Sequence, residues 1–153
     1  SSTEEPTETQ QTLAAEQPAV DTEESNDSSN NYIDWTDHDG VNIVPAVADQ
    51  GDCGACWSFM AVDGIASSWM AQNGTMLDLS AQLALNCDDE LENYGCEGNR
   101  PTNAYGYYKK NLPTTNKALP YEAKKEACSV PANSELVPVA ISTDSHISSA
   151  NAF

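Results

Sequence analysis

One short segment, residues 50–59, holds the residue types from which a nucleophilic thiol can be built. Cys56 stands where an apolar helical stretch begins, with Cys53 three residues and Gln50 six residues before it. The thiolate is the nucleophilic form of cysteine, and the N-terminus of a helix favours negative charge. The pattern therefore predicts that Cys56 attacks an electrophilic carbon.

Five cysteines, an odd number, leave at least one thiol free or paired outside the chain. Other interpretations of Cys53 and Cys56 compete with a nucleophile. A Cys-x-x-Cys pair can be a thioredoxin-like redox site, although such motifs lie near a βαβ pattern and no strand pattern precedes this one. The pair can also be half of a zinc site with Cys87 and Cys96, although structural zinc usually takes tighter ligand pairs than these two. Finally, all five can be structural, as disulfides or buried thiols.

Charge is distributed unevenly along the chain. Residues 1–31 hold eight acidic residues, no Lys or Arg and no aromatic residue, so we expect an acidic disordered tail or linker. Residues 32–153 carry 16 acidic and 6 basic residues. Nucleic acid and anionic membranes both bind basic faces, so we expect neither as a partner. No stretch approaches the roughly 18 consecutive apolar residues of a membrane span.

Apolar periodicity predicts the helix that positions Cys56. From residue 56 to residue 72 apolar residues recur at three- and four-residue spacing, which is typical of an amphipathic helix with a wide buried stripe. Asn73 and Gly74 predict its end. The stripe consists of Trp57, Phe59, Met60, Ala61, Ile65, Ala66, Trp69 and Met70.

Shorter elements are predicted further along the chain. Ser80 can cap a second helix, residues 81–86, because its hydroxyl oxygen can accept a hydrogen bond from the first turn. Pro101 at the first turn and two lysines near the end predict a third helix over residues 101–111. Residues 137–142 predict one strand in the polar stretch that follows.

Five segments, in the right order, resemble the papain-like cysteine proteases. They are Tyr32-Ile33-Asp34-Trp35, residues 50–59, Leu79-Ser80-Ala81-Gln82-Leu83 before Cys87, Tyr94-Gly95-Cys96-Glu97-Gly98, and Leu119-Pro120-Tyr121 before Cys128. The resemblance implies an α+β fold of papain type, of which this chain supplies mainly the helical first domain and only a stub of the β-rich second domain. The domains implied are an acidic tail or linker at 1–31, the helical (left) domain at 32–131 and the incomplete start of the β-rich (right) domain at 132–153.

The resemblance also implies a role for each site residue. Cys56 would be the nucleophile of a cysteine-type endopeptidase that attacks peptide carbonyls, with Gln50 helping to form the oxyanion hole. The partner implied is a peptide or protein substrate, with no metal and no cofactor. The substrate-binding residues implied are Gly54, Gly98 and Asn99, and the disulfides implied are Cys53–Cys96 and Cys87–Cys128, which leave Cys56 free.

The chain departs from the family pattern in its cleft loop. This loop usually runs Cys-x-Gly-Gly, and here Asn99 holds the last position. Asn tolerates a positive φ better than most residues, so the turn can survive. The segment between Trp35 and Gln50 is also a few residues longer than is usual in the family.

The histidine and asparagine of the family lie about 130–150 residues after the nucleophile. Only 97 residues follow Cys56, and neither His38 nor His146 resembles the family's histidine segment. We therefore expect a protein that lacks its catalytic base. The alternative to an endopeptidase is a catalytically dead pseudo-protease or fragment, acting as a binding protein or a non-functional remnant. A second chain that carries the missing histidine is then a candidate partner.

Cysteine use bears on the compartment. Two disulfides favour an oxidising environment, so we expect a secreted, lysosomal or vacuolar protein. The first residues are polar and acidic and show no signal peptide.

Overall fold

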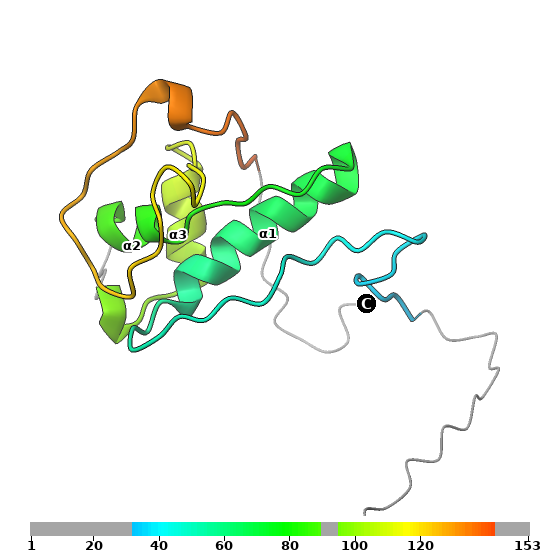
Figure 1. The fold of residues 1–153 in the computed structure, drawn as a ribbon, viewed down its shortest axis with the longest axis horizontal. Helices are drawn as coiled ribbons and strands as arrows, with labels where there is room; N and C mark the ends of the chain where they lie inside the picture. The colour runs from blue at the N-terminus through cyan, green and yellow to red at the C-terminus, as the bar shows by residue number, and fades with distance from the viewer. Residues whose placement is uncertain (1–31, 90–94, 143–153) are drawn as a thin grey trace, which may run out of the picture. The chain divides into compact units, whose positions relative to one another are not determined.

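The computed structural model describes residues 32–89 and 95–142 (Figure 1). The chain divides into two units, Ser1–Tyr32 and Ile33–Phe153. The acidic tail expected at 1–31 lies outside the described residues. In the second unit the elements are the α-helices α1 (Cys56–Asn73), α2 (Gln82–Cys87) and α3 (Pro101–Tyr108) and the 3-10 turns η1 (Gly95–Glu97) and η2 (Asn133–Glu135).

The long helix α1 begins at Cys56, as predicted, and ends at Asn73, one residue later than predicted. The Gly74 N–H donates to the Met70 carbonyl at 2.8 Å and closes the helix. Its buried residues are Trp57, Ser58, Ala61, Val62, Ile65 and Ala66. The prediction that Met60 belongs to the buried stripe is wrong, because its side chain is 58% exposed. Met60 follows Cys56 by four residues and therefore shares the face of Cys56.

The short helix α2 is buried along its whole length. Its start is fixed by two hydroxyl groups. The Ser80 Oγ accepts the Gln82 N–H at 3.1 Å, which is the hydrogen bond predicted for it, although the N-cap position itself falls on Ala81. The buried Ser58 Oγ of α1 donates to the Ala81 carbonyl at 2.5 Å. The helix lies one residue later than predicted, and its first turn is tied directly to α1.

Helix α3 begins at Pro101, as predicted, and ends at Tyr108, three residues earlier than predicted. Past its end the turn tightens, because the Lys110 N–H donates to the carbonyl three residues back, that of Tyr107, at 3.1 Å. Helix α3 packs mainly on α1.

The strand predicted over residues 137–142 is wrong. Over the two described ranges, bridge pairing is limited to isolated contacts such as Thr114 with Leu136. Pro138 has no N–H to give to a ladder, and the Val139 N–H turns back to the Val137 carbonyl at 2.7 Å. The apolar side chains of this segment instead pack singly against the helical core.

The core lies where the three helices meet. Its fully buried large side chains include Trp57, Tyr108, Leu83 and Leu85. No helix within residues 32–89 and 95–142 is long and apolar enough to cross a membrane.

Candidate active site

All five cysteines lie in described positions, and Cys56 is the free one, with an exposed side chain. The structure contains the disulfides Cys53–Cys96 and Cys87–Cys128, which are the two pairings that the resemblance implies. Cys53 is therefore not a redox partner of Cys56, and the four bonded sulfurs are not thiolate ligands for zinc. Within the described part of the chain no group of three or more metal-ligating side chains comes together.

The segment before Cys56 is fixed by close contact with the loop that carries Cys96. The Gly54 N–H donates to the Cys96 carbonyl at 2.8 Å, next to the disulfide. A Cβ on Gly54 would lie 2.5 Å from that carbonyl oxygen, so glycine is required there. The indole N–H of Trp57, which is fully buried, donates to the Gly95 carbonyl at 3.2 Å. Trp57 thus fixes the first turn of α1 against the Gly95 loop, and its burial confirms the prediction that its side chain belongs to the core.

The N-terminus of α1 is open to an anionic group. Ala55 precedes the helix and supplies no side-chain cap, and the first turn contains no acidic residue. The first amides of a helix have no partner inside it, and the helix dipole places positive potential at this end. Cys56, the first residue of the helix, lies within that potential.

Cys56 and Gln50 line the same cavity, which has a volume of about 470 Å³. The cavity lies between α1 and the extended segment that precedes it, shown in cyan in Figure 1. Its lining residues are Val44, Pro45, Ala46, Val47, Ala48, Gln50, Cys56, Phe59, Met60, Asp63, Gly64 and Ser67. An apolar concave site with a few convergent polar groups is the usual form of a ligand site.

Asp63 is the acidic residue in this cavity. It lies seven residues after Cys56, on the same face of α1. Partial burial raises the pKa of Asp63 above its usual value of 3.8. The sequence analysis did not single out Asp63, since an isolated Asp within a helix gives no signal of the cavity it lines.

Gln50 lies in a turn, and hydrogen bonds hold both the N–H and the carbonyl of the peptide group between Gln50 and Gly51. The Asp49 carboxylate accepts the Gly51 N–H at 2.8 Å, and the Tyr121 hydroxyl donates to the Gln50 carbonyl at 2.7 Å. Gly51 has a φ of 59°, in the region that favours glycine. The sequence analysis singled out Gln50 but not the support that Tyr121 gives it from 71 residues away.

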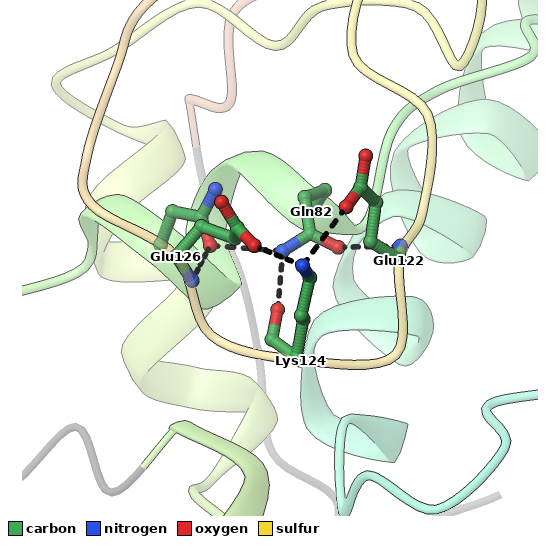
Figure 2. Close-up of polar contacts among 5 residues, drawn as sticks. Gln82, Glu122, Lys124 and Glu126 are labelled. Atoms are coloured by element: carbon green, nitrogen blue, oxygen red, sulfur yellow. Dashed lines mark hydrogen bonds and ion pairs between the residues drawn. The ribbon is translucent and has the colours of Figure 1, made fainter.

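The loop that follows Tyr121 wraps around α2, and Figure 2 shows the side chain of Gln82 bonded within it. Gln82 Nε2 donates to the Lys124 carbonyl at 2.7 Å, and Gln82 Oε1 accepts the Glu122 N–H at 2.9 Å. One turn further along α2, Asn86 Oδ1 accepts from Gln82 Nε2 at 2.8 Å and from the Glu126 N–H at 2.8 Å. Two buried amides thus fix the loop by its backbone. In the sequence, two amide side chains four residues apart on an otherwise apolar helix could have indicated that both bind a neighbouring segment.

The structure brings two of the three expected substrate-binding residues together. A Cβ on Gly54 would lie 3.5 Å from the Gly98 nitrogen. The positive φ of the cleft loop falls on Gly98, at 110°, and not on Asn99. Asn99 Oδ1 instead accepts from the Arg100 N–H at 2.8 Å and from Asn103 Nδ2 at 2.7 Å. The Asn99 side chain therefore points into the first turn of α3.

Histidine does not enter the described cavity. The ring of His38 lies against Trp35, with centroids 4.9 Å apart, and its Nε2 lies 3.8 Å from Asp39. His38 is not among the residues that line the cavity with Cys56. His146 lies outside the described residues.

A family profile and the similar proteins of known sequence all point to the same protein family. The profile described as "Papain family cysteine protease" matches residues 29–152. "Thiol protease aleurain" of Arabidopsis thaliana is 40% identical over 96 residues, which are 62% of this chain and 26% of that protein. "Cathepsin L" of Sarcophaga peregrina is 34% identical over 97 residues, 63% of this chain and 28% of that protein. The chain thus spans about a quarter of these two relatives.

Solved structures agree in fold. Digestive procathepsin L 3 of Tenebrio molitor larval midgut superposes with a TM-score of 0.61 at 31% identity, covering 69% of this chain and 33% of that one. The mostly helical structure with little strand corresponds to the helical first domain of the papain fold, which confirms the expected fold class.

Proposed function

The chain belongs to the papain family of cysteine proteases, and from this premise we propose that it carries the nucleophile of a cysteine endopeptidase. The observation that carries the proposal is the position of Cys56. Its thiol is the free one among five cysteines, it is exposed at the uncapped start of α1, and it shares a cavity with Gln50.

In the proposed reaction the Cys56 thiolate attacks the carbonyl carbon of a peptide. A C–S bond forms, and the carbonyl oxygen takes up the negative charge. The side-chain amide of Gln50 and the backbone N–H of Cys56 are the donors proposed to stabilise this oxygen. The tetrahedral species then expels the amine, which must receive a proton, and water hydrolyses the resulting thioester. Gly54 and the backbone at Gly98–Asn99 are proposed to contact the substrate chain, since the Asn99 side chain is bonded to α3.

The residues that line the described cavity include one carboxyl group, that of Asp63, and no histidine, so the imidazole partner of the family must come from outside them. The second candidate function is therefore a catalytically inactive member that binds peptides, and its supporting observation is this lining without histidine. For the first candidate, a second polypeptide that supplies a histidine is the proposed partner. The two disulfides support a secreted, lysosomal or vacuolar location.

The test uses an N-acetyl dipeptide aldehyde that carries ¹³C at its aldehyde carbon. Addition of the Cys56 thiol converts the trigonal carbon to a tetrahedral hemithioacetal, which moves its ¹³C signal far upfield. We expect one adduct per chain, and none with Cys56→Ser, which keeps both disulfides. Absence of the adduct in the wild-type chain would overturn the proposal.

A second substrate decides between the two candidate functions. Hydrolysis of the matching dipeptide nitroanilide requires a proton on the leaving amine, so it reports the acid and base as well as the thiol. Adduct formation without anilide turnover would support the peptide-binding candidate. Turnover that is lost in Cys56→Ser would support the endopeptidase.

A further inference from the structure

We propose that Tyr121 is a positioning residue that holds Gln50 in the orientation needed to stabilise the oxyanion. The inference rests on the proposed function, because it gives Tyr121 a role only through Gln50. It starts from the hydrogen bond that the Tyr121 hydroxyl donates to the Gln50 carbonyl at 2.7 Å.

This bond completes the fixation of one peptide group. The Gln50–Gly51 peptide has its N–H bound by the Asp49 carboxylate at 2.8 Å and its carbonyl bound by Tyr121. With both ends held, the peptide plane cannot rotate without breaking a hydrogen bond. Gln50 lines the cavity with Cys56, so the fixed peptide group restrains the backbone from which its side chain extends.

Tyr121 is itself held from two sides. Its ring meets the edge of Phe59 at 4.7 Å between centroids and an interplanar angle of 68°. Phe59 lies three residues after Cys56 in α1, so Tyr121 connects the Gln50 turn to the helix that carries the nucleophile. The residue after Tyr121 is bound by the buried Gln82, since the Glu122 N–H donates to Gln82 Oε1 at 2.9 Å (Figure 2).

A second contact places the same loop against the same turn. A Cβ on Gly51 would lie 3.2 Å from the Ala123 methyl group. Ala123 has a φ of 53°, which is uncommon for alanine. The backbone of the loop thus takes a less favourable conformation where it packs on the Gln50 turn, as positions that support a functional site often do.

Tyr121 remains a donor over the working range of a protease. Partial burial, and to a smaller extent the charge of Asp49, raise the pKa of Tyr121 above its usual value of 10. Below that value the hydroxyl keeps its proton, so the bond to the Gln50 carbonyl does not titrate between acidic and neutral pH.

The test measures two reactions of Cys56 in five chains: wild type, Tyr121→Phe, Gln50→Ala, the double variant Gln50→Ala/Tyr121→Phe, and Tyr105→Phe. Affinity for the ¹³C-labelled aldehyde depends on the thiol and on the oxyanion donors. The rate of alkylation by iodoacetamide depends on the thiol alone, because the displacement builds no oxyanion. Tyr121→Phe keeps the ring on Phe59 and removes only the donor. Tyr105→Phe is the matched control, because the Tyr105 hydroxyl also donates to a backbone carbonyl, that of Met60 at 3.2 Å, which belongs to α1 and not to the Gln50 turn.

We expect Tyr121→Phe to weaken aldehyde binding about three- to tenfold, as the loss of one hydrogen bond does, with iodoacetamide alkylation unchanged. Tyr105→Phe should change neither reaction. Gln50→Ala should weaken aldehyde binding at least as much, and adding Tyr121→Phe to it should have no further effect, because coupled residues are not additive.

Three outcomes would overturn the inference. Gln50→Ala could weaken aldehyde binding while Tyr121→Phe does not, or Tyr121→Phe could slow both reactions equally, or the two substitutions could add independently. The absence of any adduct in the wild-type chain is a different result, which refutes the proposed function itself.

Discussion

Gln82 is the residue whose replacement tests most sharply how the loop around α2 is held. Its side chain is 1% exposed and forms three hydrogen bonds, to Asn86, to the Lys124 carbonyl and from the Glu122 N–H. Gln82→Met keeps a side chain of similar length and removes all three polar contacts. The same loop carries Tyr121 at its start, so its anchoring bears on the Gln50 turn as well.

The expected loss of stability follows from these bonds. Each intramolecular hydrogen bond contributes about 1 kcal/mol net, and a buried group left without a partner costs about 1–3 kcal/mol. The two loop groups are only partly buried, so water can replace some of the loss. We therefore expect about 2–3 kcal/mol, a large fraction of the roughly 5–15 kcal/mol that stabilises a typical domain.

The assay is equilibrium unfolding in urea under non-reducing conditions, with Lys124→Met as the control. Lys124 forms ion pairs with Glu122 at 3.5 Å and Glu126 at 2.5 Å, but its side chain is 60% exposed. Exposed ion pairs contribute little to stability, and the Lys124 carbonyl that Gln82 binds is unchanged by the substitution. We expect Gln82→Met to lower the midpoint by about 1–2 M, given the usual slopes, and Lys124→Met to leave it in place. A wild-type midpoint for Gln82→Met, or an equal loss in Lys124→Met, would refute this reasoning.

Two further predictions concern Gly54, which precedes Cys56 in the chain, and Asp63, which lines the cavity with Cys56. Gly54→Ala should destabilise the chain by about 2–4 kcal/mol, as steric conflicts in a packed site do. The reason is that the new Cβ would lie 2.5 Å from the Cys96 carbonyl oxygen. An unchanged urea midpoint would contradict this close approach. Asp63→Asn should stabilise the chain at neutral pH, because the raised pKa of Asp63 means that its charged form is disfavoured in the folded state. The gain over wild type should be absent well below pH 3.8, where both states bind the proton, and should grow as the pH rises through the folded pKa; a gain that is the same at every pH would contradict the assignment.

Local sequence signals predicted the elements that depend on local chemistry. Apolar spacing and Gly74 gave α1 within one residue, and Pro101 gave the start of α3. The end of α3 was missed by three residues, because no local residue type marks the point after Tyr108 where the Lys110 N–H switches to the carbonyl three residues back. The strand at 137–142 was wrongly predicted because β-propensity alone supplies no partner strand, and Pro138 withholds a donor.

In the candidate site too, the sequence indicated some residues and not the long-range contacts that support them. Cys56 and Gln50 could be singled out from their spacing to the start of a helix, whereas the disulfide pairing came from the resemblance, since spacing alone does not determine connectivity. The contacts of Tyr121 with Gln50 and of Gln82 with the loop join residues about 40 to 70 positions apart. Such contacts depend on tertiary packing, which no local pattern encodes.

The most direct test of the central claim is the site of acylation by an N-acetyl dipeptide p-nitrophenyl ester. Nitrophenolate leaves without a proton, so this reaction needs the nucleophile but no general acid. If Cys56 is the nucleophile, one equivalent of nitrophenolate per chain is released in a burst, and mass spectrometry finds the acyl group as a thioester on Cys56. Release without a burst, or acyl groups spread over the lysines with none on Cys56, would contradict the claim.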